Sequence, residues 1–196
     1  MNDVDESPSG SVARKVEPSS SPAQAIRSVC VVGLGYIGLP TAAVLASRGI
    51  QVHGCDVNQA VVETVNRGEI HIVEPELDVA VHAAVNSGFL RAEIAPHAAD
   101  VFVIAVPTPF KDGHQPDLSY IQAAADAVSP VLEPGNLVIL ESTSPVGATE
   151  KLAEWLAEKR PDLSFPQEAG ENAQIHVAHC PERVLPGNVL RELVEN

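Results

Sequence analysis

Short apolar runs alternate with longer amphipathic segments over most of the chain. The runs have the continuous apolar character of strands that are covered on both faces of a parallel sheet, and they occupy residues 29–32, 50–55, 101–106, 137–140 and 175–178. The segments between them predict helices over residues 36–48, 58–67, 78–87, 118–132 and 147–159, most of which stop at a glycine or proline. Strands that alternate with helices at this spacing predict an α/β fold with a doubly wound parallel sheet.

Residues 1–25 carry no such pattern. Ser, Pro and charged residues dominate them, which is typical of chain that stays disordered. We therefore expect a disordered arm over residues 1–25 and a folded domain over residues 26–196. For the arm we favour a solvated tail over a partner-binding segment.

The composition limits which side chains can form the core and which classes of partner the chain can bind. Only 4% of the residues are aromatic although 45% are hydrophobic, so the core must consist mainly of aliphatic side chains. The 12 Lys and Arg residues stand against 26 Asp and Glu, a net charge of -14, which argues against nucleic acid and anionic membranes as partners. No apolar run approaches the roughly 20 residues that span a bilayer, and the N-terminus lacks the apolar core of a signal peptide. Three cysteines, an odd and sparse number, fit a cytoplasmic location.

Residues 33–38 read GLGYIG, a G-x-G-x-x-G motif between the first predicted strand and the first predicted helix. Gly33 permits the tight turn out of the strand, Gly35 lets a pyrophosphate approach the backbone, and Gly38 lets helix and strand pack closely. The N–H groups and the dipole of the helix N-terminus then bind the anion without a lysine. In this context the motif predicts a Rossmann-like fold and gives Gly33, Gly35 and Gly38 a cofactor-binding role.

Asp56 follows the second predicted strand, at the place where an acid accepts hydrogen bonds from a ribose of the dinucleotide. Its charge would repel a 2′-phosphate, and neither Val57 nor Asn58 offers a cation to hold one, so the pattern favours NAD over NADP. The alternative is that the glycines are only turn residues and that Asp56 only caps a helix. The flanking strand and helix favour the cofactor site.

Three further segments, residues 107–109, 141–143 and 180–183, also follow predicted strands. Ligands of open parallel sheets lie beyond the carboxyl ends of the strands, so Thr108 and Thr143 are candidates to donate hydroxyl hydrogen bonds to a ribose, the pyrophosphate or a water molecule. The alternative for both is loop stabilisation and helix capping.

The segment HVAHC, residues 176–180, raises the question of a metal site. On a strand, His176 and Cys180 share one face and His179 points to the other. Two ligands without a further cluster are a weak site, so we interpret the histidines as structural and predict no metal.

Five motifs occur in order along the chain: GLGYIGLP (33–40), GEIHIVEPELD (68–78), AVPTPF (105–110), ESTSPVG (141–147) and HCPERVLPGNVLRELV (179–194). Together they resemble the nucleotide-sugar 6-dehydrogenases, which include the UDP-glucose and GDP-mannose dehydrogenases, over residues 27–196. The resemblance implies an NAD-dependent oxidation of a sugar C6 alcohol to a carboxylate, in which two hydrides pass to two NAD molecules. A hydroxyacid dehydrogenase with a similar glycine loop is a weaker alternative, because it does not account for the second and fifth motifs.

The resemblance also implies roles for individual residues. Glu182 matches a carboxylate of the reaction centre that works through Thr143 and a water molecule and assists proton transfer; the alternative is a surface acid or an ion-pair partner of Arg183. Arg183 and Val184 are similar to substrate-contacting positions. The residues implied to contact NAD are Tyr36, Ile37, Asp56, Thr108 and Thr143.

Residues 181–187, PERVLPG, separate branches of the family. UDP-glucose dehydrogenases usually carry a Pro-Glu-Phe-Leu-x-Glu-Gly type segment, so Pro186 stands where the second Glu would be. This form resembles the UDP-N-acetylhexosamine branch and implies a UDP-sugar substrate. The best candidate is UDP-N-acetyl-D-mannosamine, oxidised to UDP-N-acetyl-D-mannosaminuronate.

The family oxidises its aldehyde intermediate through a cysteine thiolate. That cysteine lies in a Gly-rich segment downstream of the fifth motif, and the sequence ends before it, at Asn196. Cys30 and Cys55 lie inside predicted strands, and only Cys180 has plausible access, although no motif places a nucleophile there.

We therefore expect the chain to bind NAD and to turn over poorly or not at all on its own. A non-catalytic dinucleotide-binding module is the alternative. Full-length relatives form dimers largely through a long helix that this sequence lacks, so a homodimer is expected for a longer form, and apolar surface is expected where that helix would pack.

Overall fold

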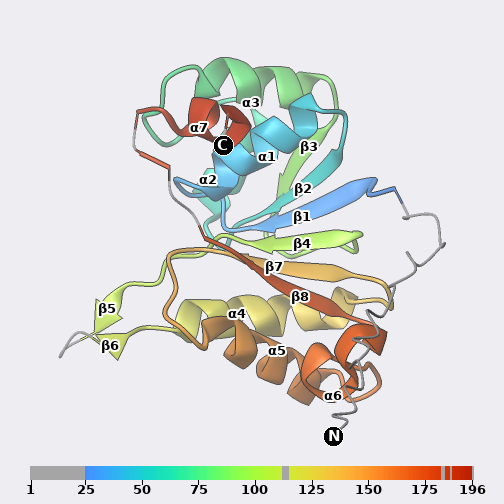
Figure 1. Cartoon of the computed structure of the whole chain (residues 1–196). Helices are drawn as coiled ribbons and strands as arrows, with labels where there is room; N and C mark the ends of the chain where they lie inside the picture. Colours follow the sequence, from blue (N-terminus) through green and yellow to red (C-terminus); the bar gives the residue numbers. More distant parts are fainter. Residues whose placement is uncertain (1–24, 112–114, 182–183, 186, 196) are drawn as a thin grey trace, which may run out of the picture.

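A six-stranded parallel sheet forms the centre of the computed structural model, which describes residues 25–111, 115–181, 184–185 and 187–195 (Figure 1). The strand order is β3-β2-β1-β4-β7-β8, and every pairing in this sheet is parallel. This order reverses direction beside β1, so the predicted doubly wound, Rossmann-like sheet is confirmed. The strands are β1 (Ser28–Val32), β2 (Gln51–Cys55), β3 (Leu90–Glu93), β4 (Val101–Ile104), β7 (Leu137–Glu141) and β8 (His176–Cys180).

Helices cover the sheet in two layers, seen above and below it in Figure 1. One layer consists of α1 (Gly38–Ser47), α2 (Gln59–Asn66), α3 (Leu77–Asn86) and α7 (Val189–Glu195), and the other of α4 (Ser119–Val128), α5 (Ala148–Lys159) and α6 (Pro166–Ala169). Short 3-10 turns follow two of them, η2 (Ser129–Val131) and η3 (Gly170–Asn172). A small antiparallel hairpin, β5 (Phe110–Lys111) and β6 (Gln115–Pro116), projects from the carboxyl edge of the sheet.

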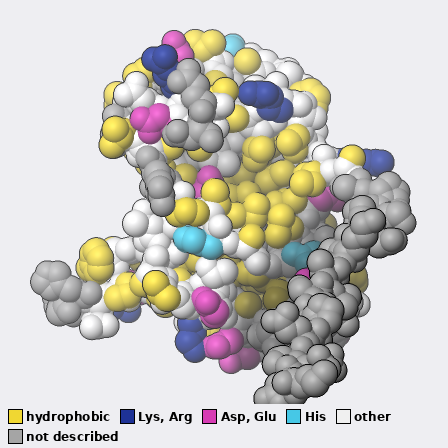
Figure 2. Space-filling view, in the orientation of Figure 1, with side chains coloured by type: hydrophobic (Ala, Val, Ile, Leu, Met, Phe, Trp, Pro, Cys, Tyr) yellow, Lys and Arg dark blue, Asp and Glu magenta, His cyan; other side chains and the backbone are white. Residues whose placement is uncertain are grey.

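Two apolar clusters lie on opposite faces of the sheet because alternate residues of each strand point to opposite sides. On β1, Cys30 and Val32 join the cluster under α4 and α5, whereas Val29 and Val31 join the cluster under α1, α2 and α3. Most members of both clusters are aliphatic, as the low aromatic content requires, and the cluster under α4 and α5 also holds the fully buried Phe102 and Phe165. Hydrophobic side chains also gather on the surface between the two helical layers (Figure 2). On β7, Leu137 and Ile139 are only partly buried.

The predicted elements differ from the structure mainly at their ends. Tyr36 and Ile37 form a turn before α1, the third predicted strand stops at Ile104, and the predicted helix over residues 118–132 finishes as the 3-10 turn η2. β3 and α7 were not predicted, and the hairpin residues were predicted to form a loop. The edge strand β3 reads LRAE, so it lacks the apolar run that marks the buried strands.

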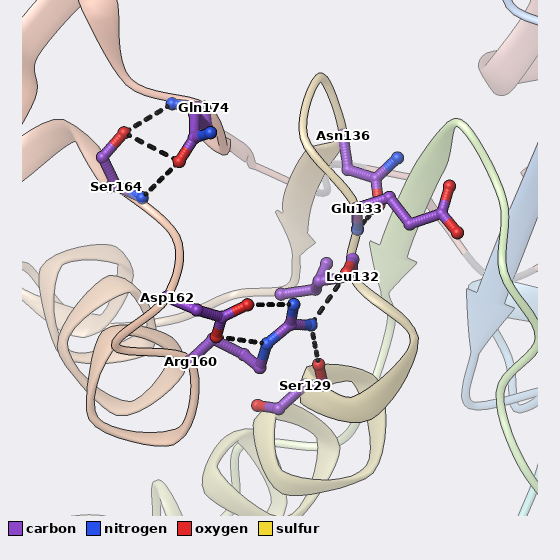
Figure 3. A network of polar contacts seen from close by, with 8 residues as sticks. All are labelled: Ser129, Leu132, Glu133, Asn136, Arg160, Asp162, Ser164 and Gln174. Carbon is purple, nitrogen blue, oxygen red and sulfur yellow. Dashed lines mark hydrogen bonds and ion pairs between the residues drawn. The ribbon is translucent and has the colours of Figure 1, made fainter.

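A network of polar contacts connects the loops near the edge of the sheet where the strands begin (Figure 3). The Arg160 guanidinium donates from one nitrogen to the carbonyl oxygens of Ser129 at 2.9 Å and Leu132 at 2.8 Å. Its remaining nitrogens donate to both oxygens of Asp162, at 2.8 and 2.7 Å. Asn136 donates to the carbonyl of Ala99 at 2.9 Å. Arg160 thus joins the end of α5 to the ends of α4 and η2, and Asn136 joins the loops that precede β7 and β4, at the edge opposite the candidate site.

Candidate functional site

A cavity of about 580 Å³ opens beyond the carboxyl ends of β1, β2, β4 and β7. Seven of the eight predicted cofactor residues line it, although they come from four separate loops. Its further lining includes small and apolar side chains of α4 and the loop after β3. The predicted residues on its wall are Gly33, Gly35, Tyr36, Ile37, Asp56, Thr108 and Thr143.

The glycine loop has the shape that its three glycines were expected to permit. Gly33 has a φ of +94°, and a Cβ there would lie 2.6 Å from the carbonyl oxygen of Ala105. A Cβ on Gly38 would lie 1.8 Å from the carbonyl oxygen of Gly33, so Gly38 holds α1 against the strand instead of lining the cavity. A Cβ on Gly35 would meet nothing within 4 Å. The second glycine therefore leaves open space between the backbone and the cavity.

The start of α1 faces this open space. Its N-cap position, Ile37, has no side-chain capping hydrogen bond. The N-terminal N–H groups of a helix attract anions when no side chain satisfies them. The open face of Gly35 and the uncapped start of α1 therefore lie where the sequence predicts the pyrophosphate.

Asp56 is half-buried on the cavity wall, directly after β2. One carboxylate oxygen accepts from the N–H of Leu34 at 2.9 Å, and the other accepts from the N–H of Asn58 at 2.9 Å. Helix α2 is capped by Asn58, whose side chain accepts from the N–H of Ala60 at 3.0 Å. The N-cap of α2 is therefore Asn58, and Asp56 supports the turn before it. Each carboxylate oxygen keeps a further lone pair for a ribose hydroxyl.

Thr108 and Thr143 meet across the cavity mouth. The Thr108 hydroxyl donates to the carbonyl oxygen of Thr143 at 2.8 Å, so its proton stabilises the two loops, as in the alternative considered for it. Its oxygen remains available as an acceptor. Thr143 is exposed, and its hydroxyl lies on the wall of the same cavity.

Some lining residues were given no role from the sequence, although residues 141–143 were placed at this edge of the sheet. Glu141 and Ser142, at the end of β7, are 8% and 7% exposed and border the cavity; the Glu141 carboxylate accepts from the Thr41 hydroxyl at 3.4 Å. Both residues belong to the ESTSPVG motif, which is visible in the sequence. Their burial is apparent only in the structure. Ile94 was missed because β3, which it follows, was not predicted, and Tyr120 because it lies on the first turn of α4.

The comparison with protein families decides what this cavity belongs to. Residues 27–196 match the family model described as UDP-glucose/GDP-mannose dehydrogenase family, NAD binding domain. The chain belongs to this family. Because the matched region is the family's NAD-binding domain, NAD is its cofactor.

Two relatives in the UDP-glucose/GDP-mannose dehydrogenase family carry an N-acetylated hexosamine or its uronic acid in their names. The chain is 68% identical over 170 residues to an NDP-N-acetyl-D-galactosaminuronic acid dehydrogenase of Ralstonia nicotianae, covering 87% of this chain and 40% of the relative. It is 63% identical over 169 residues to the UDP-N-acetyl-D-mannosamine dehydrogenase of Escherichia coli, covering 86% and 40%. The chain thus spans about 40% of the length of these relatives.

Solved structures of the family have the same fold. The native UDP-N-acetyl-mannosamine dehydrogenase of Staphylococcus aureus superposes with a TM-score of 0.79 at 39% identity, over 86% of this chain and 40% of that one. A UDP-glucose dehydrogenase from Pyrobaculum islandicum gives 0.72 at 32% identity, over 88% and 40%. The likeness therefore extends across branches that differ in sugar.

The three cysteines are free thiols. Burial raises the pKa of Cys30 to about 11 and that of Cys55 to about 12. Cys180 is exposed, but partial burial and then the charge of Glu141 raise its pKa as well. A nucleophilic cysteine needs a lowered pKa, so this environment disfavours Cys180 as the nucleophile of the reaction.

The remaining predicted residues fall on the fifth motif. Glu182 and Arg183 lie outside the described residues, as do residues 1–24 of the expected arm. Val184 is partly buried. His176 and Cys180 both lie on β8, and no group of three or more metal-binding side chains occurs within the described parts of the chain. None of the described helices is long and apolar enough to cross a bilayer.

Proposed function

We propose that this chain is the NAD-binding part of a dehydrogenase that oxidises the C6 alcohol of a UDP-N-acetylhexosamine to the carboxylate. The observation that carries the proposal is the juxtaposition of the open face of Gly35 with Asp56 on one cavity wall. The Ralstonia and Escherichia coli relatives are named for an N-acetylated hexosamine nucleotide or its uronic acid. UDP-N-acetyl-D-mannosamine is the first substrate to test, and the galactosamine relative makes the corresponding galacto sugar the second.

The chemistry divides between cofactor and protein. Bound NAD supplies a hydride acceptor, and oxidation of an alcohol to a carboxylate consumes two NAD molecules and one water and releases three protons. In this chain the glycine loop binds the pyrophosphate, and Asp56 orients the ribose and excludes a 2′-phosphate. Thr143 and Glu182 are proposed to guide a proton through a water molecule near the sugar.

We propose that the 196-residue chain binds NAD without efficient turnover. The cysteine nucleophile implied by the family resemblance is not among its three thiols, because Cys30 and Cys55 are buried and Cys180 has a raised pKa. A non-catalytic dinucleotide-binding module is the second candidate. Free thiols fit the cytoplasm, and the apolar side chains over β7 fit a homodimer or a further domain in a longer form.

The test follows NADH formation with UDP-N-acetyl-D-mannosamine, its galacto counterpart and UDP-glucose. The coding sequence beyond Asn196 is read first, and any longer product is assayed beside the chain. Turnover of an N-acetylated sugar by the longer product, with NAD binding by the short chain, supports the dehydrogenase. A stop codon after Asn196 and NAD binding without turnover of any sugar support the non-catalytic module.

A further inference from the structure

Glu74 is 4% exposed although it lies in the loop between α2 and α3. Its carboxylate accepts three hydrogen bonds from two distant parts of the chain. The Tyr36 hydroxyl donates to one oxygen at 2.9 Å, and the N–H of Gly187 donates to the same oxygen at 2.9 Å. The N–H of Val189 donates to the other oxygen at 2.7 Å. Glu74 therefore joins the glycine loop to the turn that begins α7.

The surrounding backbone is shaped for this contact. Glu76 has a φ of +64°, a left-handed conformation that is unfavourable for a residue with a side chain. This turn starts α3 at Leu77, which is fully buried, and leaves the Glu74 side chain facing the protein. Burial alone would raise the pKa of Glu74, but the N–H groups of Gly187 and Val189 and the Tyr36 hydroxyl outweigh it and lower the pKa. The carboxylate is thus ionised and acts only as an acceptor.

The two partners have different duties in the site. Tyr36 lies between the second and third glycines and lines the cofactor cavity. Gly187 and Val189 belong to the fifth motif, whose earlier residues are implied to contact the sugar, and Val189 is fully buried at the start of α7. A change in the position of one partner must be transmitted to the other, because both donate to one buried carboxylate.

We propose that Glu74 is a positioning residue that couples NAD binding to the docking of α7 and the Gly187 turn. NAD restrains the glycine loop and Tyr36, and this lowers the entropy lost when the carboxylate also holds Gly187 and Val189. The same coupling makes a docked α7 favour NAD. The link to the sugar rests on the proposed function, but the coupling itself does not.

Amide hydrogen exchange tests the coupling without turnover, so failure of the sugar assignment would not affect the result. In the unmodified chain, saturating NAD should slow exchange at Gly187 and Val189 about fivefold or more. Tyr36→Phe removes the link but leaves the carboxylate, so NAD should no longer slow exchange at these amides. Glu74→Gln removes the charge and turns one of the two acceptor oxygens into an NH2 donor, while Gly187 and Val189 donate to different oxygens. The same amides should therefore exchange at least about tenfold faster with or without NAD.

Glu76→Gln is the matched control, because it makes the same substitution two residues away on an exposed side chain and should change none of these rates. Binding of adenosine separates coupling from general damage, since adenosine reaches Asp56 but carries no phosphate for the glycine loop. Glu74→Gln should weaken NAD about fivefold and adenosine less than about twofold. The proposal is overturned if NAD does not slow exchange at Gly187 and Val189, if the slowing persists in Tyr36→Phe, or if Glu74→Gln weakens both ligands equally.

Discussion

The carboxylate of Asp56 accepts a hydrogen bond from the backbone N–H of Leu34 at 2.9 Å. Leu34 lies in the middle of the glycine loop after β1, and Asp56 follows β2, so the groups that would hold the pyrophosphate and a ribose of the dinucleotide are fixed relative to each other. Such preorganisation reduces the ordering cost of binding.

Two glycine-to-alanine substitutions in this loop should act on different properties: one on stability and the other on NAD affinity. Gly38→Ala places a Cβ on the carbonyl oxygen of Gly33 and should lower the free energy of unfolding by about 3 kcal/mol. Gly35→Ala meets no protein atom, so stability should change by less than about 0.5 kcal/mol. The new methyl group occupies the space of the pyrophosphate, so NAD should bind at least about tenfold more weakly. Denaturant unfolding and NAD titration of both variants check the contrast, and equal stability losses would contradict it.

Much of this site could be predicted because it depends on local sequence. The strands that precede Gly33, Asp56 and Thr143 are apolar runs with polar ends, and parallel strands bring those ends to one edge. Contacts that depend on distant parts of the chain could not be predicted. The Tyr36 hydroxyl donates a hydrogen bond to the Glu74 carboxylate, 38 positions away, and the Thr108 hydroxyl donates to the carbonyl oxygen of Thr143.

Two short elements, β3 and α7, were also not predicted. The edge strand β3 has only four residues, and two of them, Arg91 and Glu93, are charged. Its strand conformation depends on pairing with β2. Helix α7 has seven residues, too few to be stable alone. It is held by burial of Val189 and by the Glu74 carboxylate.

Glu76 offers a stabilising substitution. Its φ of +64° costs about 1–2 kcal/mol for a residue with a side chain, whereas glycine adopts this region freely. After allowance for the larger entropy of glycine in the unfolded chain, Glu76→Gly should raise the free energy of unfolding by about 0.5–1 kcal/mol. Glu76→Ala keeps the strain and should give no gain. Chemical denaturation of the two variants measures the difference, and a gain in both would show that strain is not the cause.

Arg160 should stabilise the fold without affecting the cofactor. Its guanidinium holds two carbonyl oxygens at the ends of α4 and η2, and a lysine ammonium cannot reproduce this fork. Arg160→Lys should lower the free energy of unfolding by about 2 kcal/mol. Asp162→Asn removes only an exposed ion-pair partner and should cost less than about 1 kcal/mol. NAD affinity should be unchanged in both variants; a loss of affinity would mean that this edge communicates with the site.

Cys180 should behave as an unactivated thiol. Its pKa is raised above the ordinary value of 9.0 by partial burial and by Glu141, so its thiolate fraction at neutral pH is lower than that of a free cysteine. Alkylation by iodoacetamide should therefore be slower than for free cysteine at pH 7, and its rate should still rise as the pH passes 9.0. Mass spectrometry of the folded chain measures these rates. Alkylation faster than free cysteine at pH 7 would restore Cys180 as a candidate nucleophile.

The most direct test of the NAD site is a calorimetric titration of the chain with NAD and with NADP, beside Asp56→Ala and Asp56→Asn. NAD should bind saturably, and NADP at least about tenfold more weakly, because Asp56 repels its 2′-phosphate. Both variants should bind NAD about 10–100-fold more weakly, and Asp56→Asn should narrow the gap to NADP, since it removes the charge and keeps the shape. Equal binding of NAD and NADP by the unmodified chain, or unchanged NAD affinity in folded Asp56→Ala, would contradict this account of the site.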